Sequence, residues 1–467
     1  MTLLLALPVL AEQKLDKNGF PIKEHLQNHF KFYGFIRNYF VFDSRESKAG
    51  TGDLFYYLPL DNKWNTTDLN NPAREDLNAS PNFRFLALTS RVGVDVSGYY
   101  YKNLHFGAKV EADFYAGLSA AKSANGLSGN TSVSGTAQMR LRQAYVTLTW
   151  KNLWWDYSEK AQVGLKIGQA WHPMAADHPH LFSLEVGAPF GPFSRTPLVQ
   201  MDASLGDHWV LSAAAIWQMQ YQSAGPDGAS AAYMKYGCTP ESYLAMAYRN
   251  KNFLIRAGAD LVSIKPRNVG ANADGLTVHV KDRKTSILYY LYTQYTNKKF
   301  SLKAKTVYGE GGEHMNLMSG YAVVDKSDPT NWKYASLRNS SSWLSLSYGK
   351  KWQGVLFLGY VKNFGLARRT ASGYIEKGDI YFCGNGFSNI NQMYRVNPQL
   401  LYNFGKFTLG LEYQWTSVQY GNYRSGDYEI DGEKVELSSA LNGIGLATEN
   451  LHWVGNHRVN MMIKFTF

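Results

Sequence analysis

Two arginines placed two positions apart, Arg140 and Arg142, are the clearest candidates for solute chemistry in this chain. Residues two apart in an extended strand point to the same face, so both guanidinium groups would act on one site. A guanidinium stays charged and binds a carboxylate or phosphate through two parallel hydrogen bonds. If 138–150 is a strand, the pair therefore predicts a surface that attracts small anions.

A histidine-rich segment is a second candidate, because it could imitate a metal site. His172, Asp177, His178 and His180 lie close together in the sequence, and imidazole and carboxylate groups are ligands that Zn²⁺ takes. Two prolines interrupt the segment, and short histidine clusters in loops are usually solvated or structural. We therefore expect no metal site and no cofactor. Nor does any spacing of serine, histidine and acidic residues single out a catalytic set.

The elements that position these residues are strands with one apolar and one polar face. Between Leu104 and Ala116 apolar residues occupy every second position, and Lys109, Glu111 and Asp113 lie between them. Alternation with period two is typical of a strand whose faces meet different surroundings. A face with such charges must lie in water, which excludes a sheet with apolar layers on both sides.

The same alternation, bounded by turn residues, predicts sixteen strands. They span 30–43, 83–97, 104–116, 138–150, 161–171, 196–204, 208–221, 241–249, 253–264, 284–296, 300–309, 341–348, 353–363, 391–402, 407–419 and 451–467. Short connections rich in turn residues alternate with long ones, which are 44–82, 117–137, 172–195, 222–240, 265–283, 310–340, 364–390 and 420–450. This segregation of loop lengths, with an even strand number, is typical of an all-β, transmembrane antiparallel outer-membrane β-barrel with short periplasmic turns and long extracellular loops.

The composition agrees with this fold class. The 467 residues are 45% hydrophobic and 15% aromatic, yet the mean hydropathy is −0.32 and no 18 consecutive residues are apolar, which excludes a spanning helix. Aromatic residues suit the two rims of a barrel, although a glycan-binding β protein would use them too. The net charge of +11 is spread over the strands and does not suggest nucleic acid. Cys238 and Cys383 could pair or stay free.

Both ends of the chain carry features of exported proteins. An apolar run at 2–10, followed by small residues and a charge, predicts a secretory signal at 1–11. Residues 12–29 indicate a short periplasmic lead-in, and the barrel would occupy 30–467. The last strand ends at Phe467 with its apolar residues on one face, like the strand that the outer-membrane assembly machinery reads. We expect a bacterial outer-membrane protein with both termini periplasmic, in contact with lipid and lipopolysaccharide.

Several segments resemble the DcaP-like porins, in particular their Bacteroidota-type branch. The matching stretches are 34–45 (GFIRNYFVFDSR), 84–99 (RFLALTSRVGVDVSGY), 108–115 (AKVEADFY) and 167–201 (IGQAWHPMAADHPHLFSLEVGAPFGPFSRTPLVQM). The resemblance implies a sixteen-stranded homotrimeric channel that favours small anionic solutes such as dicarboxylates. One departure is the long N-terminal helical extension of some members, which is not seen here, so the resemblance does not extend to coiled-coil support of a trimer.

The segment 172–195 is expected to fold inward as a constriction loop, because its apolar residues gain nothing in water. The alternatives are a loop over the rim or a subunit contact. The residues expected at the pore and constriction are Arg91, Lys109, Glu111, Asp113, Arg140, Arg142, Lys166, Arg195, Arg256, Lys303 and Lys305. The strand register also turns inward the cations Arg37, Arg458 and Lys464 and the acids Asp43, Asp95, Asp202, Asp260 and Glu412. We expect partial pairing of these charges, with a modest cationic surplus.

Together these features predict a porin for passive diffusion of small hydrophilic, preferentially anionic solutes. The alternatives are a surface receptor or adhesin that uses the 44–82 and 310–340 loops, and a barrel enzyme without an open pore. A folded plug would need roughly a hundred residues of its own, and none of the predicted connections is that long.

Overall fold

The computed structural model describes residues 29–50, 55–66, 68, 70–87, 89–115, 138–151, 153, 161–370, 374–383, 389–422, 428–430, 433–435 and 441–467. The expected signal at 1–11, nearly all of the lead-in and the 117–137 loop lie outside these residues.

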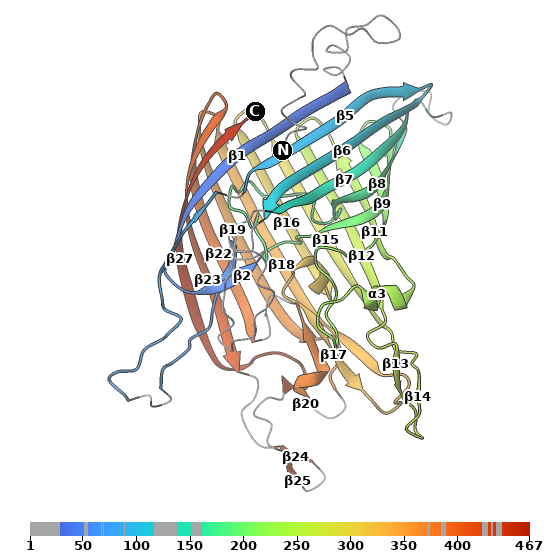
Figure 1. The fold of residues 1–467 in the computed structure, drawn as a ribbon, viewed down its shortest axis with the longest axis vertical. Coiled ribbons are helices and arrows are strands. Elements are labelled where there is room, and N and C mark those ends of the chain that lie inside the picture. Colours follow the sequence, from blue (N-terminus) through green and yellow to red (C-terminus); the bar gives the residue numbers. More distant parts are fainter. Residues whose placement is uncertain are drawn as a thin grey trace, which may run out of the picture.

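The described residues form one closed antiparallel barrel, drawn in Figure 1. Its second strand is interrupted and consists of β4 and β5, so that the circle has sixteen strands. In order they are β1 (Phe30–Asp43), β4 (Asn82–Leu86) with β5 (Arg91–Tyr101), β6 (Leu104–Tyr115), β7 (Gln138–Lys151), β8 (Gln162–Trp171), β9 (Arg195–Leu205), β10 (Trp209–Ile216), β11 (Glu241–Arg249), β12 (Phe253–Ile264), β15 (Lys284–Thr296), β16 (Phe300–Glu310), β18 (Lys333–Gly349), β19 (Trp352–Leu366), β22 (Ile390–Phe404), β23 (Phe407–Asn422) and β27 (Glu449–Thr466).

The barrel closes because the first and last strands pair. β1 and β27 run antiparallel from Phe35 opposite Thr466 to Asp43 opposite Arg458. The closed ladder leaves no strand edge with unpaired backbone groups, which is the condition for a sheet in lipid. The predicted fold class, a sixteen-stranded antiparallel barrel, is confirmed.

The strand bounds confirm most of the predicted ones, and β1, β11, β12 and β15 agree at both ends. Two strands differ. β10 ends at Ile216 instead of 221, and beyond its end the side chain of Gln220 lies against Arg195. β18 begins at Lys333 instead of 341, because its first residues pair with β17 (Gly320–Asp325) in a hairpin beyond the barrel.

The remaining elements lie in the long connections. The strands are β2 (Ser47–Gly50), β3 (Phe55–Pro59), β13 (Val269–Ala271), β14 (Thr277–His279), β20 (Tyr374–Ile375), β21 (Ile380–Phe382), β24 (Tyr428–Ile430), β25 (Glu433–Val435) and β26 (Leu441–Asn442), and the described helices are α3 (Ala232–Gly237), η2 (Glu313–Met315) and η3 (Lys377–Asp379). Among the described residues, no helix has the length and hydrophobicity to cross a bilayer. Cys238 is exposed and Cys383 is buried, and no disulfide joins the two.

The two faces of the barrel wall differ in polarity. Val92, Val110 and Val146 are 38–49% exposed on the outer face of β5, β6 and β7. The charged Glu111 and Asp113, at alternate positions of β6, are buried on the inner face. The aromatic residues exposed beside the short turns include Tyr101, Trp209, Tyr348, Trp352 and Phe407. The outer surface is therefore an apolar band with an aromatic rim, and the polar side chains face the lumen.

Candidate functional site

The connection between β8 and β9, residues 172–194, lies against the inner wall of the barrel, and we call it the inner loop. Its two ends meet where His172 N donates to Ser194 O at 3.0 Å. Its middle reaches β19, which lies opposite β8 and β9 in the circle of strands, and there Phe190 packs edge-on against Phe357 with ring centroids 6.2 Å apart. The loop therefore spans the lumen.

Three cations that were expected in the lumen hold the first part of this loop, residues 174–178, to the wall. We call this part its near side. Lys305 Nζ donates to the carbonyl oxygens of Met174 at 2.7 Å and Asp177 at 3.0 Å, and Lys303 Nζ donates to His178 O at 3.1 Å. Arg256 pairs with the Asp177 carboxylate. Lys305 is buried beneath the loop. These cations therefore position the inner loop as well as contributing charge.

The far side of the inner loop is held by a buried charge network of which the sequence predicted only the inward-facing Arg458 and Asp43. Glu185 accepts from Arg458 NH1 at 3.0 Å, and its carboxylate lies 3.6 Å from Arg395 NH1. Arg395 also donates to Ala188 O at 3.2 Å. Arg458 reaches Asp43 through its Nε at 2.8 Å. This buried network fixes the loop to β22, β27 and β1.

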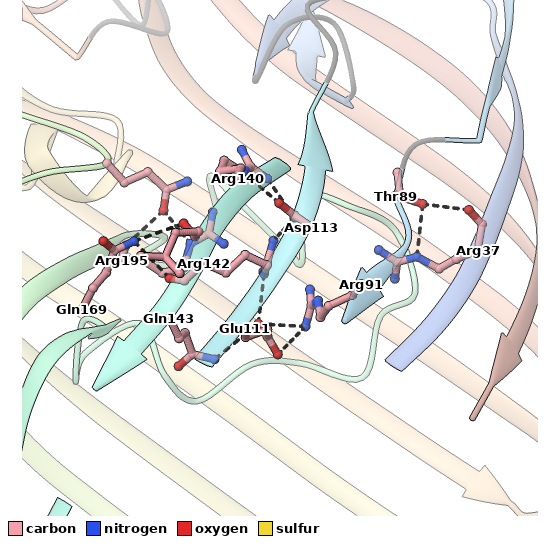
Figure 2. Close-up of polar contacts among 12 residues, drawn as sticks. Arg37, Thr89, Arg91, Glu111, Asp113, Arg140, Arg142, Gln143, Gln169 and Arg195 are labelled. Atoms are coloured by element: carbon pink, nitrogen blue, oxygen red, sulfur yellow. Dashed lines mark hydrogen bonds and ion pairs between the residues drawn. The ribbon is translucent and has the colours of Figure 1, made fainter. Parts of the chain in front are cut away.

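Five arginines on strands β1 to β9 face the inner loop, and we call them the arginine cluster (Figure 2). They are Arg37 of β1, Arg91 of β5, Arg140 and Arg142 of β7, and Arg195 of β9. The first four come from strands whose alternation turns them inward, and Arg195 begins the strand to which the inner loop returns.

Two carboxylates of β6 organise part of this cluster. Arg140 makes two hydrogen bonds of 2.9 Å to Asp113, and Arg142 contacts Asp113 at 2.5 Å and Glu111 at 3.0 Å. Arg91 lies 3.4 Å from Glu111. A β-bulge in the β6–β7 register leaves Arg142 as the extra residue, so that Arg140, Arg142 and Gln143 all face the lumen. The expected pairing of Glu111 and Asp113 with arginines is confirmed.

The other two arginines of the cluster have neutral partners. Arg37 Nε donates to Thr89 Oγ1 at 3.4 Å, and Arg195 Nε donates to Gln220 Oε1 at 3.0 Å. The buried NH1 of Arg195 has no hydrogen-bond partner among the described residues. With five guanidinium groups against two carboxylates, the cluster carries a positive surplus beside the loop.

A cavity of about 90 Å³ separates the arginine cluster from the inner loop. The guanidinium groups line one side, and the loop contributes Leu181, Leu184, Val186 and Phe193. A small anion placed there would meet several fixed donors in surroundings of reduced water content, where electrostatic attraction is stronger than in bulk water.

A wider cavity of about 770 Å³ lies between the inner loop and the short turns. Its charged lining consists of the cations Lys166, Arg249, Lys251 and Arg256 and the acids Asp177 and Asp202. Lys109, also expected at the pore, pairs with Asp95 at 2.8 Å and donates to Tyr33 OH at 3.2 Å. The wide cavity is thus lined by charges of both signs, and the larger cationic surplus lies at the narrow one.

The histidine-rich segment does not come together as one group. His180 Nε2 lies 2.9 Å from Ser301 Oγ, while His178 packs edge-on to Trp171 at 4.4 Å between ring centroids. Burial, and then Lys305 and Lys303, lower the pKa of His178 to about 3, and burial followed by Lys303 lowers that of His180 to about 4. His172 meets Glu241 of β11 and Asp260 of β12 instead.

Sequence reasoning missed Thr89, Gln220, Glu185 and Arg395. Arg395 had a usable signal, because Arg395, Asn397 and Gln399 occupy every second position of β22 and therefore share its inner face. Glu185 and Gln220 lie in irregular segments, where no periodicity assigns a direction to a side chain.

The fold is that of known outer-membrane channels. No protein-family model and no curated protein matches this chain. Among solved structures, the outer-membrane channel DcaP of Acinetobacter baumannii superposes with a TM-score of 0.58 at 16% identity, covering 94% of this chain and 97% of that one. An anion-selective porin from Comamonas acidovorans gives a TM-score of 0.49 at 10% identity, over 94% and 99% of the two chains. At 16% identity the likeness to the first establishes the barrel fold.

Proposed function

We propose that this protein is an outer-membrane porin through which small hydrophilic solutes, preferentially anions, diffuse passively. The observation that carries this proposal is the arginine cluster, which faces the inner loop across a narrow cavity inside a closed barrel. In this proposal the inner loop is the constriction, and the wide cavity is the vestibule on the side of the short turns.

The apolar outer band supports a place in the outer membrane, in contact with lipid and lipopolysaccharide. With the short turns on the periplasmic side, Phe30 at the start of β1 and Phe467 at the end of the chain both lie at the periplasmic rim. The same end strand would be the part that the assembly machinery reads. We further propose a homotrimer, as the resemblance to DcaP-like porins implies.

The selection mechanism follows from fixed charge in a narrow passage. An anion that enters the narrow cavity exchanges some hydration for hydrogen bonds from Arg195 and its neighbours, whereas a cation meets the positive surplus. Binding must stay weak for flux to continue, so millimolar affinity is expected, about −4 kcal/mol. Added salt should weaken the preference, because the Debye length shortens from roughly 8 Å at physiological strength to roughly 3 Å at 1 M.

Planar-bilayer recording tests the proposal directly. A porin gives steady single-channel conductance with no ligand present, and the step size scales with salt concentration. A receptor or a barrel enzyme with a closed lumen would insert into the bilayer and give no steady conductance. The same preparation should run as a heat-modifiable band on gels, which shows that the barrel is folded.

A further inference from the structure

Four buried ionisable side chains meet on the wall where the inner loop begins. His172 is the first residue of that loop, Glu241 begins β11, Asp260 lies in β12, and His314 lies in η2. None of the four is more than 3% exposed. One ligand atom each of His172, Glu241 and Asp260 lies within 4.8 Å of the others, and His314 Nε2 lies 3.2 Å from Glu241 Oε1 and 3.6 Å from Asp260 Oδ2.

The protonation of His172 is set by a backbone group. Met174 N donates to His172 Nδ1 at 3.1 Å, so Nδ1 presents its lone pair and the ring proton lies on Nε2. That nitrogen is 2.7 Å from Glu241 Oε1, which is the distance of a direct hydrogen bond. A second proton, on Nδ1, would face another donor. His172 is therefore a neutral hydrogen-bond donor to Glu241.

The rest of the group has more buried polar atoms than hydrogen-bond partners. Glu241 Oε2, both oxygens of Asp260 and both ring nitrogens of His314 have no hydrogen-bond partner among the described residues. The nearby cations are engaged elsewhere, since Lys284 pairs with Glu313 at 3.0 Å and Arg256 with Asp177. Buried polar atoms without partners are unfavourable, and a cation placed among these carboxylate oxygens and the imidazole nitrogen would satisfy them.

We propose that Glu241, Asp260 and His314 bind one divalent transition-metal ion of the zinc class, with His172 orienting Glu241. Ligand atoms at about 2.1 Å from a tetrahedral ion are roughly 3.4 Å apart, close to the 3.2 and 3.6 Å found between His314 and the two carboxylates. An imidazole ligand favours Zn²⁺ over Mg²⁺ or Ca²⁺. A hydrogen bond from His172 to a ligating carboxylate is the usual support for such a site.

By joining Glu241 of β11 to His314 of η2, the ion would link the two elements that hold the two ends of the inner loop. His172 at its start contacts the ligand Glu241, and Phe193 N near its end donates to Met315 O at 2.9 Å, next to the ligand His314. This site is separate from the arginine cluster, so it does not depend on the proposed transport of anions. Its role is structural, because it fixes a loop that crosses the lumen.

The test is metal content of the full-length protein refolded in detergent with Zn²⁺ and then passed over a chelating resin. The proposal predicts about one zinc per folded chain, and Co²⁺ in its place should give the visible absorption of a low-symmetry site. Asp260→Asn and His314→Gln should lose the ion. His180→Gln is the matched control, because that imidazole contacts Ser301 instead of the cluster, and it should keep the ion.

His172→Gln separates orientation from ligation. It should retain one zinc per chain but release it to a competing chelator about 10–100-fold more readily. Heat-modifiable migration identifies folded protein for each variant, so a variant that fails to fold is not scored as metal-free. Folded wild type without bound metal would overturn the proposal, as would equal metal content in folded Asp260→Asn and wild type.

Discussion

Phe190 of the inner loop packs directly on Gly359 of β19, where the wall has no side chain. A Cβ atom at position 359 would lie 2.5 Å from Phe190 Cγ. Phe357 and Trp343 flank the same place, and Gly410 of β23 receives Phe182 in a similar way, with 2.9 Å between the position of its absent Cβ and the ring. These two glycines are depressions in the inner wall that seat the aromatic rings of the loop.

Replacing Gly359 with leucine should therefore unseat the inner loop. Overpacking of this kind costs about 1–3 kcal/mol, so the heat-modified gel band should appear at lower temperature and the single-channel conductance should rise. Gly354→Leu is the control, because position 354 is on the outer face of the same strand and its Cβ would meet nothing within 4 Å. Identical conductance in Gly359→Leu and wild type would show that the loop does not narrow the pore.

Lys305→Met tests the anchoring of the loop by a buried ammonium group. The change leaves the carbonyl oxygens of Met174 and Asp177 without their donor, and hydrogen bonds from a charged donor contribute about 1.5–3 kcal/mol each. We expect frequent conductance fluctuations as the loop moves. Lys166→Met removes the same charge from the wide cavity and should alter selectivity without added noise. Equal noise in the two variants would contradict the anchoring role.

Acidification should loosen the inner loop through His178. Burial, then Lys305 and Lys303, lower its pKa from 6.5 to about 3, so the folded loop favours the neutral imidazole. Its contribution to stability is complete above pH 6.5 and is lost as the pH falls toward 3. Wild type should show more conductance fluctuations at pH 4.5 than at pH 7. His178→Phe keeps a ring against Trp171 but cannot be protonated, so it should reduce this difference; an unchanged difference would exclude His178.

The apolar outer band predicts a position-dependent cost of charge. Val110→Arg on the outer face of β6, where Val110 is 46% exposed, should destabilise the folded barrel in lipid by roughly 2–4 kcal/mol. Thr149→Lys, which faces the wide cavity, should be tolerated. Urea titration in lipid vesicles measures both. Equal tolerance of the two changes would mean that Val110 does not face lipid.

The strands could be predicted from the sequence because their signals are local. Alternation and turn residues give β11, β12 and β15 at both ends, since the period of two and the turn chemistry act over a few positions. The β-bulge at Arg142 leaves no trace in that pattern, because an extra residue changes the direction of side chains only once the register with β6 is known.

The site could be predicted only in part, because its geometry depends on contacts distant in sequence. Inward alternation identified Arg91, Arg140 and Arg142, but the contact of Lys305 with Met174 joins residues 131 positions apart. The histidines show the same dependence on contacts distant in sequence. Neighbours in sequence such as His178 and His180 separate, whereas His172 meets His314 across a shared carboxylate, that of Glu241.

The measurement that tests the central claim most directly is the zero-current potential across a tenfold KCl gradient, recorded for wild type and for Arg37→Gln/Arg195→Gln. Those two arginines donate to Thr89 and Gln220, so their removal takes charge from the cluster without uncoupling Glu111 or Asp113. We predict anion preference in wild type, a clear shift toward zero in the double variant, and no shift in Lys350→Gln, a charge at the exposed turn between β18 and β19. Cation preference in wild type, or an unchanged potential in the double variant, would contradict the account.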